Sequence, residues 1–398
     1  MKKEIYIIGC GPGDILHLTQ NAREAIVTCE EVYAFGRFYE FFQSIRDDIK
    51  RCSYCELFNK IGNSKAKTVG ILVSGDVGFF SMAKTLVERF DNEHKIHTFC
   101  GISSLQYFCA RVGVSYENIG IVSLHGREQS ILGYIAYNRY TFVLTGGENN
   151  AVKILKQLSD YGISDITVTV GERLSMPDER IVNGSVAELL RYDFDSLTVL
   201  LFENKYYRDR ESTLFDKDFI RNETPMTKQE VRWISINMLN IKPSDTVFDI
   251  GAGSGSVAIE MSRKAYNGLV YAIEKDAKAH ALLNENRLVL GALNLIPVLG
   301  EATIEIKKLP IPNKIFIGGS GGNLREIIEY SYRNNPEVAM VINAITLETL
   351  SLAINVLKDL GIRPSISCIN CARNKVLGEY NLMNANNPVY IISVMPDR

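Results

Sequence analysis

Residues 246–255, Thr-Val-Phe-Asp-Ile-Gly-Ala-Gly-Ser-Gly, decide how this chain is interpreted. Val247, Phe248 and Ile250 form a short apolar run typical of a buried strand. Glycines follow at alternate positions, and residues 256–263 then have the pattern of a helix start. Glycine lets the backbone approach a ligand closely because it has no Cβ. The stretch therefore predicts a strand, a glycine loop and a helix that form a nucleotide-type site in an α/β sheet.

A second strand is expected at residues 271–274, and it ends in the carboxylate of Glu274. A carboxylate at that place can accept two hydrogen bonds from a ribose diol. The spacing G-x-G-x-G departs from the dinucleotide fingerprint, because position 256 is Ser. With Asp249 two residues before it, the loop resembles motif I of the class I S-adenosylmethionine methyltransferases. An ordinary glycine turn is the alternative. The loop residues expected to bind S-adenosylmethionine are Gly251, Ala252, Gly253, Ser254 and Gly255.

Length and composition set the class of protein. A chain of 398 residues is too long for one typical core, so two domains are expected. Hydrophobic residues make up 46% and charged residues 23%, as in a globular protein, and the net charge of −2 gives no basic excess for nucleic acid. No apolar run has the length of a membrane span, and Glu4 interrupts the only signal-like start. We therefore expect a cytoplasmic protein without nucleic-acid or membrane partners.

Eight cysteines are scattered along the chain, which fits reduced thiols. Two pairs have C-x-x-C spacing, Cys52 with Cys55 and Cys368 with Cys371. A four-cysteine zinc site would require the two pairs to meet. Because they fall in different predicted domains, no metal site is expected.

Several strands of the first half are predicted to end in glycine-rich turns. Residues 4–8 precede Gly-Cys-Gly-Pro-Gly-Asp at 9–14, residues 69–74 precede Gly-Asp at 75–76, and residues 96–99 precede Gly-Ile-Ser-Ser at 101–104. Pro12 and the run at 16–19 delay the first helix. This loop is therefore not expected to form the same strand–loop–helix site as the loop at 251. The ends of parallel strands lie on one rim, where ligands bind.

These motifs, together with Leu-His-Gly-Arg at 124–127, resemble the tetrapyrrole methylases, with the closest likeness to the CbiE branch that methylates carbon 5 in corrin synthesis. The resemblance covers residues 1–205. It implies two α/β subdomains with cofactor and substrate in the cleft between them. The count of expected strands supports a break near residues 113–120. Val77 departs from the family, in which many members have Pro. Carried over by position, the expected contacts with S-adenosylmethionine are Pro12, Gly75, Asp76, Phe79, Ser103 and Ser104. Asp14 and Arg127 would face the tetrapyrrole, although Arg127 as a plain surface charge stays open.

Residues 206–223 are charged and lack apolar periodicity, so we expect an exposed linker. Thr227 and Glu230 have the spacing of a capping box at a helix start. The Pro-Met-Thr-Lys run at 225–228, Gly-Glu-Ala at 300–302 and the glycine-rich run at 316–322 resemble CbiT, which methylates carbon 15 of the macrocycle and removes an acetate carboxyl. This resemblance covers residues 224–398 and implies that Thr227 and Ala302 reach the cofactor; for Thr227, a capping role alone is equally open.

Gly-Gly-Ser-Gly-Gly at 318–322 follows the expected fourth strand of this domain. Enzymes that methylate amines place an N-P-P-Y type sequence there. The similar Asn-Pro-Val-Tyr at 387–390 comes before the last strand instead and is interpreted as a turn. Backbone N–H groups of a glycine loop can form an anion nest, so Gly319, Ser320 and Gly321 are candidates for the substrate carboxylates. A flexible loop is the alternative. Asn343, expected after the fifth strand, is a further substrate candidate or a plain turn residue.

The fold class expected from both resemblances is α/β: a tetrapyrrole-methylase fold followed by a class I Rossmann-like methyltransferase domain. The function implied is methylation of precorrin-6B, with or without cobalt, at carbon 15 with decarboxylation and at carbon 5, to give precorrin-8. Methylation of RNA or protein and a non-catalytic tetrapyrrole carrier are the alternatives. We also expect a homo-oligomer. The two halves are expected to be chemically independent, and neither should need the other to bury its apolar surface.

Overall fold

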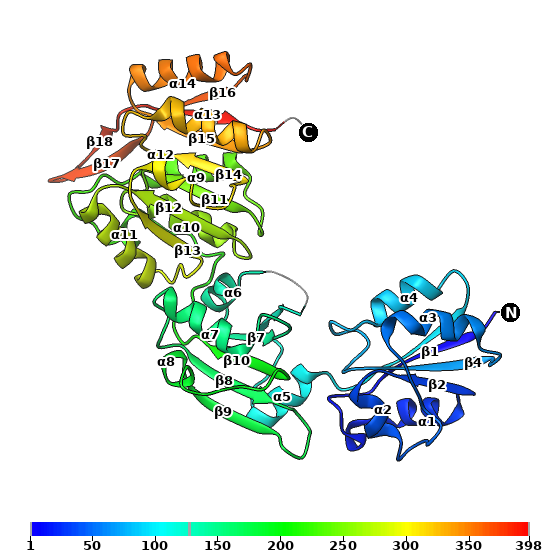
Figure 1. Ribbon diagram of the computed structural model, residues 1–398. Helices are drawn as coiled ribbons and strands as arrows, with labels where there is room; N and C mark the ends of the chain where they lie inside the picture. The colour runs from blue at the N-terminus through cyan, green and yellow to red at the C-terminus, as the bar shows by residue number, and fades with distance from the viewer. Residues whose placement is uncertain (1, 126–128, 397–398) are drawn as a thin grey trace. The chain divides into compact units, whose positions relative to one another are not determined.

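The computed structural model describes residues 2–125 and 129–396 (Figure 1). The described residues form two compact units. Unit 1 comprises residues 2–125 and 140–202, and unit 2 comprises residues 129–139 and 203–396. The prediction of a mixed α/β protein with two subdomains followed by a class I sheet is confirmed. Among the described residues, no helix is both long and apolar enough to cross a membrane.

The first part of unit 1 is a five-stranded sheet with the order β3-β2-β4-β1-β5, whose recorded pairs are parallel. Ile5 and Ile7 of β1 pack in one core cluster with residues of α3 and α4, and Ile8 packs in another with residues of α1 and α2. Successive side chains of a strand point to opposite faces, which explains this division. The elements are β1 (Glu4–Gly9), the 3₁₀ helix η1 (Ile15–His17), α1 (Gln20–Thr28), β2 (Glu31–Ala34), α2 (Arg37–Phe42), β3 (Lys50–Arg51), α3 (Tyr54–Asn63), β4 (Thr68–Val73), α4 (Ala83–Phe90) and β5 (Lys95–Phe99).

The second part of unit 1 is a sheet with the order β6-β7-β10-β8-β9. Its elements are α5 (Ser104–Val112), β6 (Ile119–Ser123), β7 (Tyr140–Leu144), α7 (Ala151–Asp160), β8 (Thr167–Glu172), β9 (Arg180–Ser185), α8 (Val186–Leu189) and β10 (Thr198–Glu203). Leu105 and Phe108 of α5 belong to the core cluster of this second sheet. The break expected near residues 113–120 is therefore wrong, because it lies before α5, where the buried side of that helix joins its new sheet.

Unit 2 has a seven-stranded sheet with the order β13-β12-β11-β14-β15-β19-β16. The recorded pairs are parallel except for those of β19, which runs antiparallel to β15 and β16. Strand β11 is the point from which the order runs in both directions, and such a switch point is where open α/β sheets bind ligands. The glycine loop at 251 follows β11 directly, so the predicted motif lies at the expected place.

The elements of unit 2 are α6 (Leu132–Tyr137), the 3₁₀ helix η2 (Asp216–Asp218), α9 (Gln229–Leu239), β11 (Thr246–Ile250), α10 (Ser256–Lys264), β12 (Leu269–Glu274), α11 (Ala277–Val289), β13 (Leu295–Leu299), α12 (Ala302–Glu305), β14 (Lys314–Ile317), α13 (Leu324–Asn334), β15 (Ala339–Ala344), α14 (Leu347–Asp359), β16 (Ser365–Ile369), β17 (Ala372–Leu377), β18 (Tyr380–Ala385) and β19 (Val389–Val394).

Helix α6 comes from the first half of the sequence but packs on α10 within unit 2. The Tyr137 hydroxyl lies 3.0 Å from Oγ of Ser262 and donates to Oδ1 of Asn294 at 3.1 Å. A Cβ on Gly133 would lie 1.8 Å from the carbonyl oxygen of Tyr266, so only glycine allows this contact. The expectation that neither half needs the other to bury its surface is therefore wrong at this helix.

The segment expected as an exposed linker, residues 206–223, is partly buried. Asp216 is 8% and Phe219 is 4% exposed, and Phe219 belongs to the core of unit 2. Arg232, whose side chain is fully buried, donates from Nη1 to Oδ1 of Asp216 at 3.1 Å and from Nε to Oε1 of Glu260 at 2.6 Å. One charge of this segment, Asp216, is thus the partner of a buried arginine, which composition alone does not reveal.

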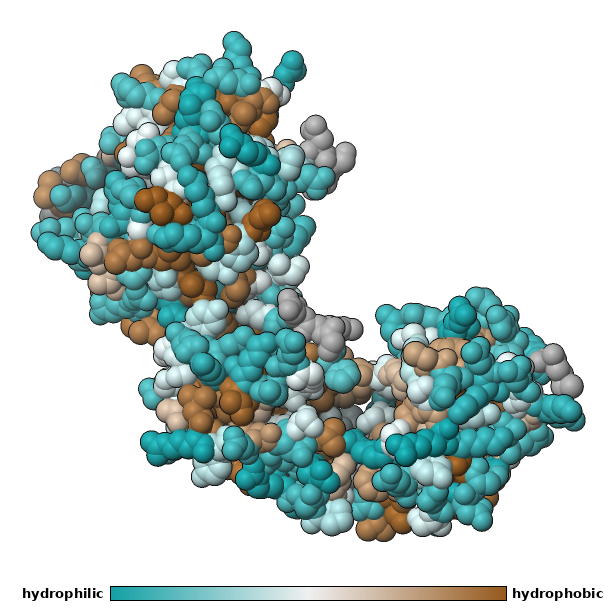
Figure 2. Space-filling model, in the orientation of Figure 1, coloured by the Kyte–Doolittle hydropathy of each residue, from teal (hydrophilic) through white to brown (hydrophobic). Residues whose placement is uncertain are grey.

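Strands β17 and β18 form a two-stranded ribbon that makes no sheet contact with the seven-stranded sheet. Arg373 anchors its base by donating to Glu230 at 3.0 Å and to Asp216 at 2.9 Å. Figure 2 shows hydrophobic colour over this ribbon at the left edge of the molecule. Its large exposed apolar residues are Val376, Leu377, Tyr380, Leu382 and Met383.

Candidate functional site

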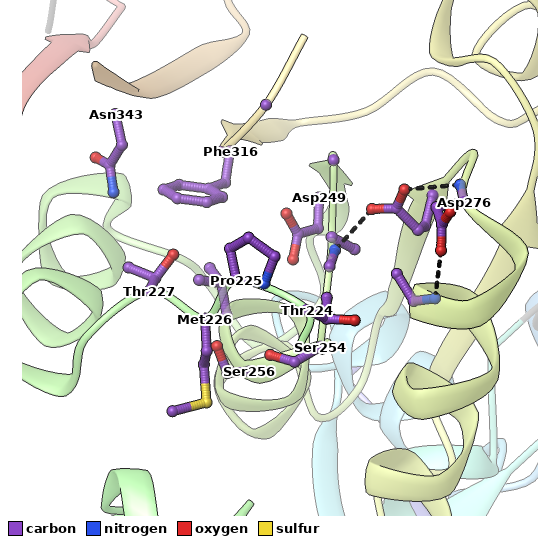
Figure 3. Close-up of a pocket in the computed structure, with 18 of the residues that line it drawn as sticks. Thr224, Pro225, Met226, Thr227, Asp249, Ser254, Ser256, Asp276, Phe316 and Asn343 are labelled. Atoms are coloured by element: carbon purple, nitrogen blue, oxygen red, sulfur yellow. Dashed lines mark hydrogen bonds between the residues drawn. The ribbon is translucent and has the colours of Figure 1, made fainter. Parts of the chain in front are cut away.

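A cavity of about 940 Å³ opens at the carboxyl ends of the central strands of unit 2. Its lining comes from the loops after β11, β12 and β14, from strand β15, and from the segment before α9 (Figure 3). Of the predicted residues, those that line it are Thr227, Gly251, Ala252, Gly253, Ser254, Glu274, Ala302, Gly319, Ser320, Gly321 and Asn343. The structure thus brings both predicted sets, for cofactor and for substrate, to one cavity.

The glycine loop after β11 is held by close backbone packing. The N–H groups of Gly251 and Ala252 donate to the carbonyl of Ile273 at 3.0 and 3.1 Å. Gly251 has φ +72, and a Cβ there would lie 2.3 Å from the carbonyl oxygen of Gly319. The loop after β14 therefore rests directly on the loop after β11, which only a residue without a side chain permits.

Glu274 joins the glycine loop to the end of β12. Its Oε2 accepts from the N–H of Gly253 at 2.8 Å, and its Oε1 accepts from the N–H of Asp276 at 2.9 Å, both drawn as dashed lines in Figure 3. Each carboxylate oxygen can accept more than one hydrogen bond. Glu274 therefore keeps acceptor capacity for a ligand while it fixes the loop.

Asp249 precedes the loop inside β11 and is 1% exposed. Neither of its carboxylate oxygens has a hydrogen bond of normal geometry to a described residue. Burial, with a smaller contribution from the charge of Glu274, raises the pKa of this carboxyl to about 8. The hydroxyl of Ser254 is likewise buried without a partner among the described residues. These polar atoms border the cavity and suit a ligand that carries positive charge and hydrogen-bond donors.

Thr227 does not cap a helix, so the predicted capping box is wrong. Helix α9 begins at Gln229, its N-cap is Lys228, and no side chain caps it. The carbonyl of Thr227 accepts from Nη1 of the buried Arg232 at 2.7 Å. That bond holds the segment in an extended course past the cavity, where Figure 3 places Thr227 beside Phe316 and Asn343. A ligand-facing role remains the prediction for its side chain.

Asn343 lies inside strand β15, not after it as predicted. Its Oδ1 lies 3.0 Å from Oγ of Ser235, whereas its Nδ2 is buried without a partner in the described part of the chain. An unsatisfied buried donor is costly, and a cavity ligand would relieve that cost. The observation agrees with the substrate-facing interpretation of Asn343, which remains a prediction, and removes the plain-turn alternative.

In unit 1, three glycine-rich loops meet at the ends of β1, β4 and β5. Gly11 and Gly75 exchange two backbone hydrogen bonds of 3.1 and 2.9 Å. A Cβ on Gly101 would lie 2.3 Å from the carbonyl oxygen of Gly75. Asp76 ties the loops together, since its Oδ2 accepts from the N–H of Gly101 at 3.0 Å and its Oδ1 from that of Gly78 at 2.8 Å.

The other predicted residues of unit 1 lie around these loops. Ser103 is the N-cap of α5, and Ser104 is its first residue. Phe79 is half-buried and packs on Phe142 at 6.3 Å between ring centroids. Asp14 caps η1 by accepting from the N–H of Leu16 at 2.9 Å, and Pro12 is buried in the same loop. Arg127 falls outside the described residues.

Three features of the cavity differ from the sequence interpretation or extend it. Gly255 does not line the cavity; it has φ +80, and a Cβ on it would lie 2.8 Å from Cγ of Leu283, so it serves the start of α10. Lys275 and the segment 222–226 line the cavity but were not predicted. Lys275 directly follows Glu274, so its place at the same strand end is a signal that the sequence did contain.

Two protein families match successive parts of the chain. Residues 4–190 match the tetrapyrrole (corrin/porphyrin) methylases, and residues 218–395 match the precorrin methyltransferase domain. A relative from Pyrobaculum aerophilum, described as a probable cobalt-precorrin-6B C(15)-methyltransferase (decarboxylating), is 34% identical over 182 residues, which are 45% of this chain and 93% of the relative. The chain belongs to the precorrin methyltransferases.

Two further relatives of this precorrin methyltransferase carry the names of methyltransferases that act at carbon 5, or at carbons 5 and 15. A probable cobalt-precorrin-7 C(5)-methyltransferase from Methanocaldococcus jannaschii is 32% identical over 209 residues, which are 50% of this chain and 97% of the relative. A precorrin-6Y C(5,15)-methyltransferase [decarboxylating] from Sinorhizobium is 26% identical over 333 residues, which are 79% of this chain and 78% of the relative. The predicted fusion of two methyltransferase types in one chain is confirmed.

Proposed function

We propose that the protein transfers methyl groups from S-adenosylmethionine to precorrin-6B or its cobalt form. Unit 2 acts at carbon 15 with loss of an acetate carboxyl as CO₂, and unit 1 acts at carbon 5, to give precorrin-8. The observation that carries this proposal is that one cavity of unit 2 joins the loop of motif I to the glycine loop after β14. The names of the Pyrobaculum and Methanocaldococcus relatives support one reaction each, and the Sinorhizobium name supports both.

The residues of the cavity fit S-adenosylmethionine, which supplies a methyl group on a positively charged sulfur. Glu274 has acceptor capacity for a ribose diol beside the glycine loop. The buried Asp249 and Ser254, unpaired within the described residues, offer acceptors to a cationic ligand. At about 940 Å³, the cavity lies at the upper end of the roughly 300–1,000 Å³ of small-molecule sites, which leaves space for part of a second substrate.

The arrangement favours methylation of carbon over methylation of an amine or a base. No proton-accepting side chain follows β14, where residues 318–322 are Gly-Gly-Ser-Gly-Gly. An electron-rich meso carbon of the tetrapyrrole needs no base before it attacks, so the residues have to orient it in line with the methyl group. Asn343, Phe316 and the glycine loop form the wall that can hold the macrocycle and exclude water. The net charge of −2 also disfavours RNA as the substrate.

Mass spectrometry of the products formed from precorrin-6B tests the proposal. We expect a first product with one added methyl and one lost CO₂, and a second product with one more methyl. Equilibrium dialysis with S-adenosylmethionine separates the alternatives. Two equivalents bound without turnover of precorrin-6B would favour methylation of RNA or protein, and the absence of binding would favour a tetrapyrrole carrier.

We propose further that the protein is a cytoplasmic homo-oligomer. The β17–β18 ribbon supports assembly, because an isolated two-stranded sheet is marginal in water and this one exposes five large apolar side chains. A second copy of the chain can cover the ribbon of the first by a two-fold contact. The eight free cysteines suit a reducing compartment. Light scattering of the full chain measures the assembly, and a monomer at micromolar concentration would contradict it.

A further inference from the structure

Lys275 lies between the two loops of the cavity in unit 2 and has no role in the function proposed so far. It follows Glu274 at the end of β12 and lines the same cavity. Its ammonium lies beside the loop after β14, because a Cβ on Gly321 would be only 2.9 Å from Nζ of Lys275. At the end of β12, the carboxylate of Glu274 therefore lies at the loop after β11, and the ammonium of Lys275 lies at the second glycine loop, which follows β14.

The second glycine loop has unused donors on the side where Lys275 lies. The N–H groups of Gly318 and Gly319 both donate to the carbonyl of Ile250, at 3.0 and 3.3 Å. In the described part of the chain, no hydrogen bond is recorded for the N–H groups of residues 320–322. Gly321 and Gly322 have φ of +56 and +94, a left-handed backbone that glycine adopts without steric cost. Because the N–H of Gly319 is already used, the anion nest predicted for residues 319–321 is shifted by one residue, to residues 320–322.

Glu301 restrains Lys275 without using up its charge. The distance from Nζ of Lys275 to Oε1 of Glu301 is 3.3 Å, and the two side chains are 52% and 44% exposed. An ammonium has three donors, so two remain for a ligand. An exposed pair of this kind adds little to stability. The pair instead positions Lys275, because it keeps the ammonium beside the loop after β14.

We propose that Lys275 and the N–H groups of residues 320–322 bind one carboxylate of the tetrapyrrole, and that this carboxylate is not the acetate lost as CO₂. The inference rests on the proposed function, because it takes a polycarboxylate macrocycle as the substrate. It assigns Lys275 as a substrate-binding residue of unit 2.

The direction in which charge moves during decarboxylation indicates which carboxylate of the tetrapyrrole Lys275 binds. Decarboxylation moves negative charge from the carboxylate into the macrocycle. An ammonium paired with that carboxylate would stabilise the ground state more than the transition state and would slow the reaction. Lys275 therefore serves a carboxylate that keeps its charge throughout. Such uniform binding lowers KM and leaves kcat unchanged.

The substitution Lys275→Gln in the full chain tests this assignment. We expect KM for precorrin-6B in the decarboxylating methylation to rise about five- to tenfold, with kcat within about twofold of the wild type and KM for S-adenosylmethionine unchanged. Lys275→Glu should raise KM for precorrin-6B further. The matched control is Lys307→Gln, which breaks a similarly exposed pair with Glu326, 3.1 Å apart, outside the cavity. It should behave as the wild type.

The outcomes separate this inference from the proposed function. A wild-type protein that does not convert precorrin-6B would overturn the proposed function and the assignment with it. A wild type that is active together with a Lys275→Gln variant of unchanged KM would overturn the assignment alone. A change in kcat at unchanged KM would also overturn it, since a rise would place Lys275 at the reacting carboxylate and a fall would mean that Lys275 acts only in the transition state.

Discussion

At the scale of single residues, Glu274 has two tasks that the sequence motif presented as one. The strand-end position predicted a ribose acceptor, and the structure adds that the same carboxylate accepts from the N–H groups of Gly253 and Asp276. Both tasks need a group that only accepts hydrogen bonds. We therefore expect Glu274 to couple the conformation of the loop to the affinity for the cofactor.

Glu274→Gln should raise KM for S-adenosylmethionine in the decarboxylating methylation about tenfold or more. The amide has one accepting oxygen, so its NH₂ group must face an N–H donor or the ribose, and hydrogen bonds to a charged group are worth about 1.5–3 kcal/mol. Steady-state kinetics of the full chain measure this effect, with Glu285→Gln on the exposed side of α11 as control. An unchanged KM would remove Glu274 from the cofactor site.

Asp249 makes the folded protein less stable as pH rises, whereas most carboxyl groups make a folded protein more stable as pH rises. Its pKa in the folded protein, about 8, lies above the value of about 3.9 in an unfolded chain. The folded state therefore holds the proton longer, and the stability contributed by this group falls as pH rises from about 4 to about 8. Above pH 8 the loss is complete.

Asp249→Asn should stabilise the ligand-free protein, and the gain should grow by on the order of 2 kcal/mol between pH 6 and pH 8. Above about pH 8 the gain should level off. Urea unfolding of both proteins across this range provides the free energies. A gain that is equal at every pH would show that Asp249 is ionised in the folded protein.

At the scale of elements, the β11 and β14 loops form one structure. Close contact between Gly251 and Gly319 fixes the loop after β11 against the loop after β14, and the pair lies at the switch point of the sheet. Sequence patterns predicted each loop from its own glycines. They could not predict that the two touch, because the loops lie far apart in the chain and only the strand order β11-β14 joins them.

Helix α6 gives a prediction at the same scale. Gly133→Ala places a Cβ against the carbonyl of Tyr266, so we expect a loss of several kcal/mol in the unfolding free energy of unit 2. Tyr137→Phe removes one hydroxyl from the network of Ser262 and Asn294 and should cost about 1–2 kcal/mol.

Gly62→Ala is the control for these variants, because Gly62 lies in α3 with open space where a Cβ would stand. It should be neutral or slightly stabilising. Thermal unfolding followed by calorimetry compares the three proteins. If Gly133→Ala unfolds like the wild type, α6 does not pack on α10.

At the scale of the whole molecule, the chain carries two predicted sites, and each of the two units that hold them combines separate stretches of the sequence. Helix α6 belongs to the first half of the sequence, but it packs as part of unit 2. A fragment of residues 222–398 would lack Tyr137, the hydrogen-bond partner of Ser262 and Asn294, so cutting the chain is a poor test of independence. Substitution within the full chain is the better test.

Gly253→Arg in the full chain should abolish methylation at carbon 15 and the release of CO₂. The arginine side chain would enter the cavity at a residue with φ +54, where even a Cβ comes within 3.1 Å of the carbonyl of Pro225. Methylation of supplied precorrin-7 at carbon 5 should continue at the wild-type rate. Product analysis on each substrate, with calorimetry to confirm that both units remain folded, decides the question. The loss of both activities in a folded protein would mean that the halves share one active centre.

The sequence by itself determined the fold classes, the two families and part of the lining of the cavity in unit 2. Glycine loops, strand ends and their spacing are local patterns, and the physics of backbone geometry ties such patterns to a site. The tertiary structure alone decided which distant groups meet. Examples are Lys275 beside Gly321, Arg232 with Asp216, and Tyr137 with Asn294. Burial and pairing of these groups depend on how the strands are ordered and the helices packed, and no pattern within a short stretch of sequence encodes that order.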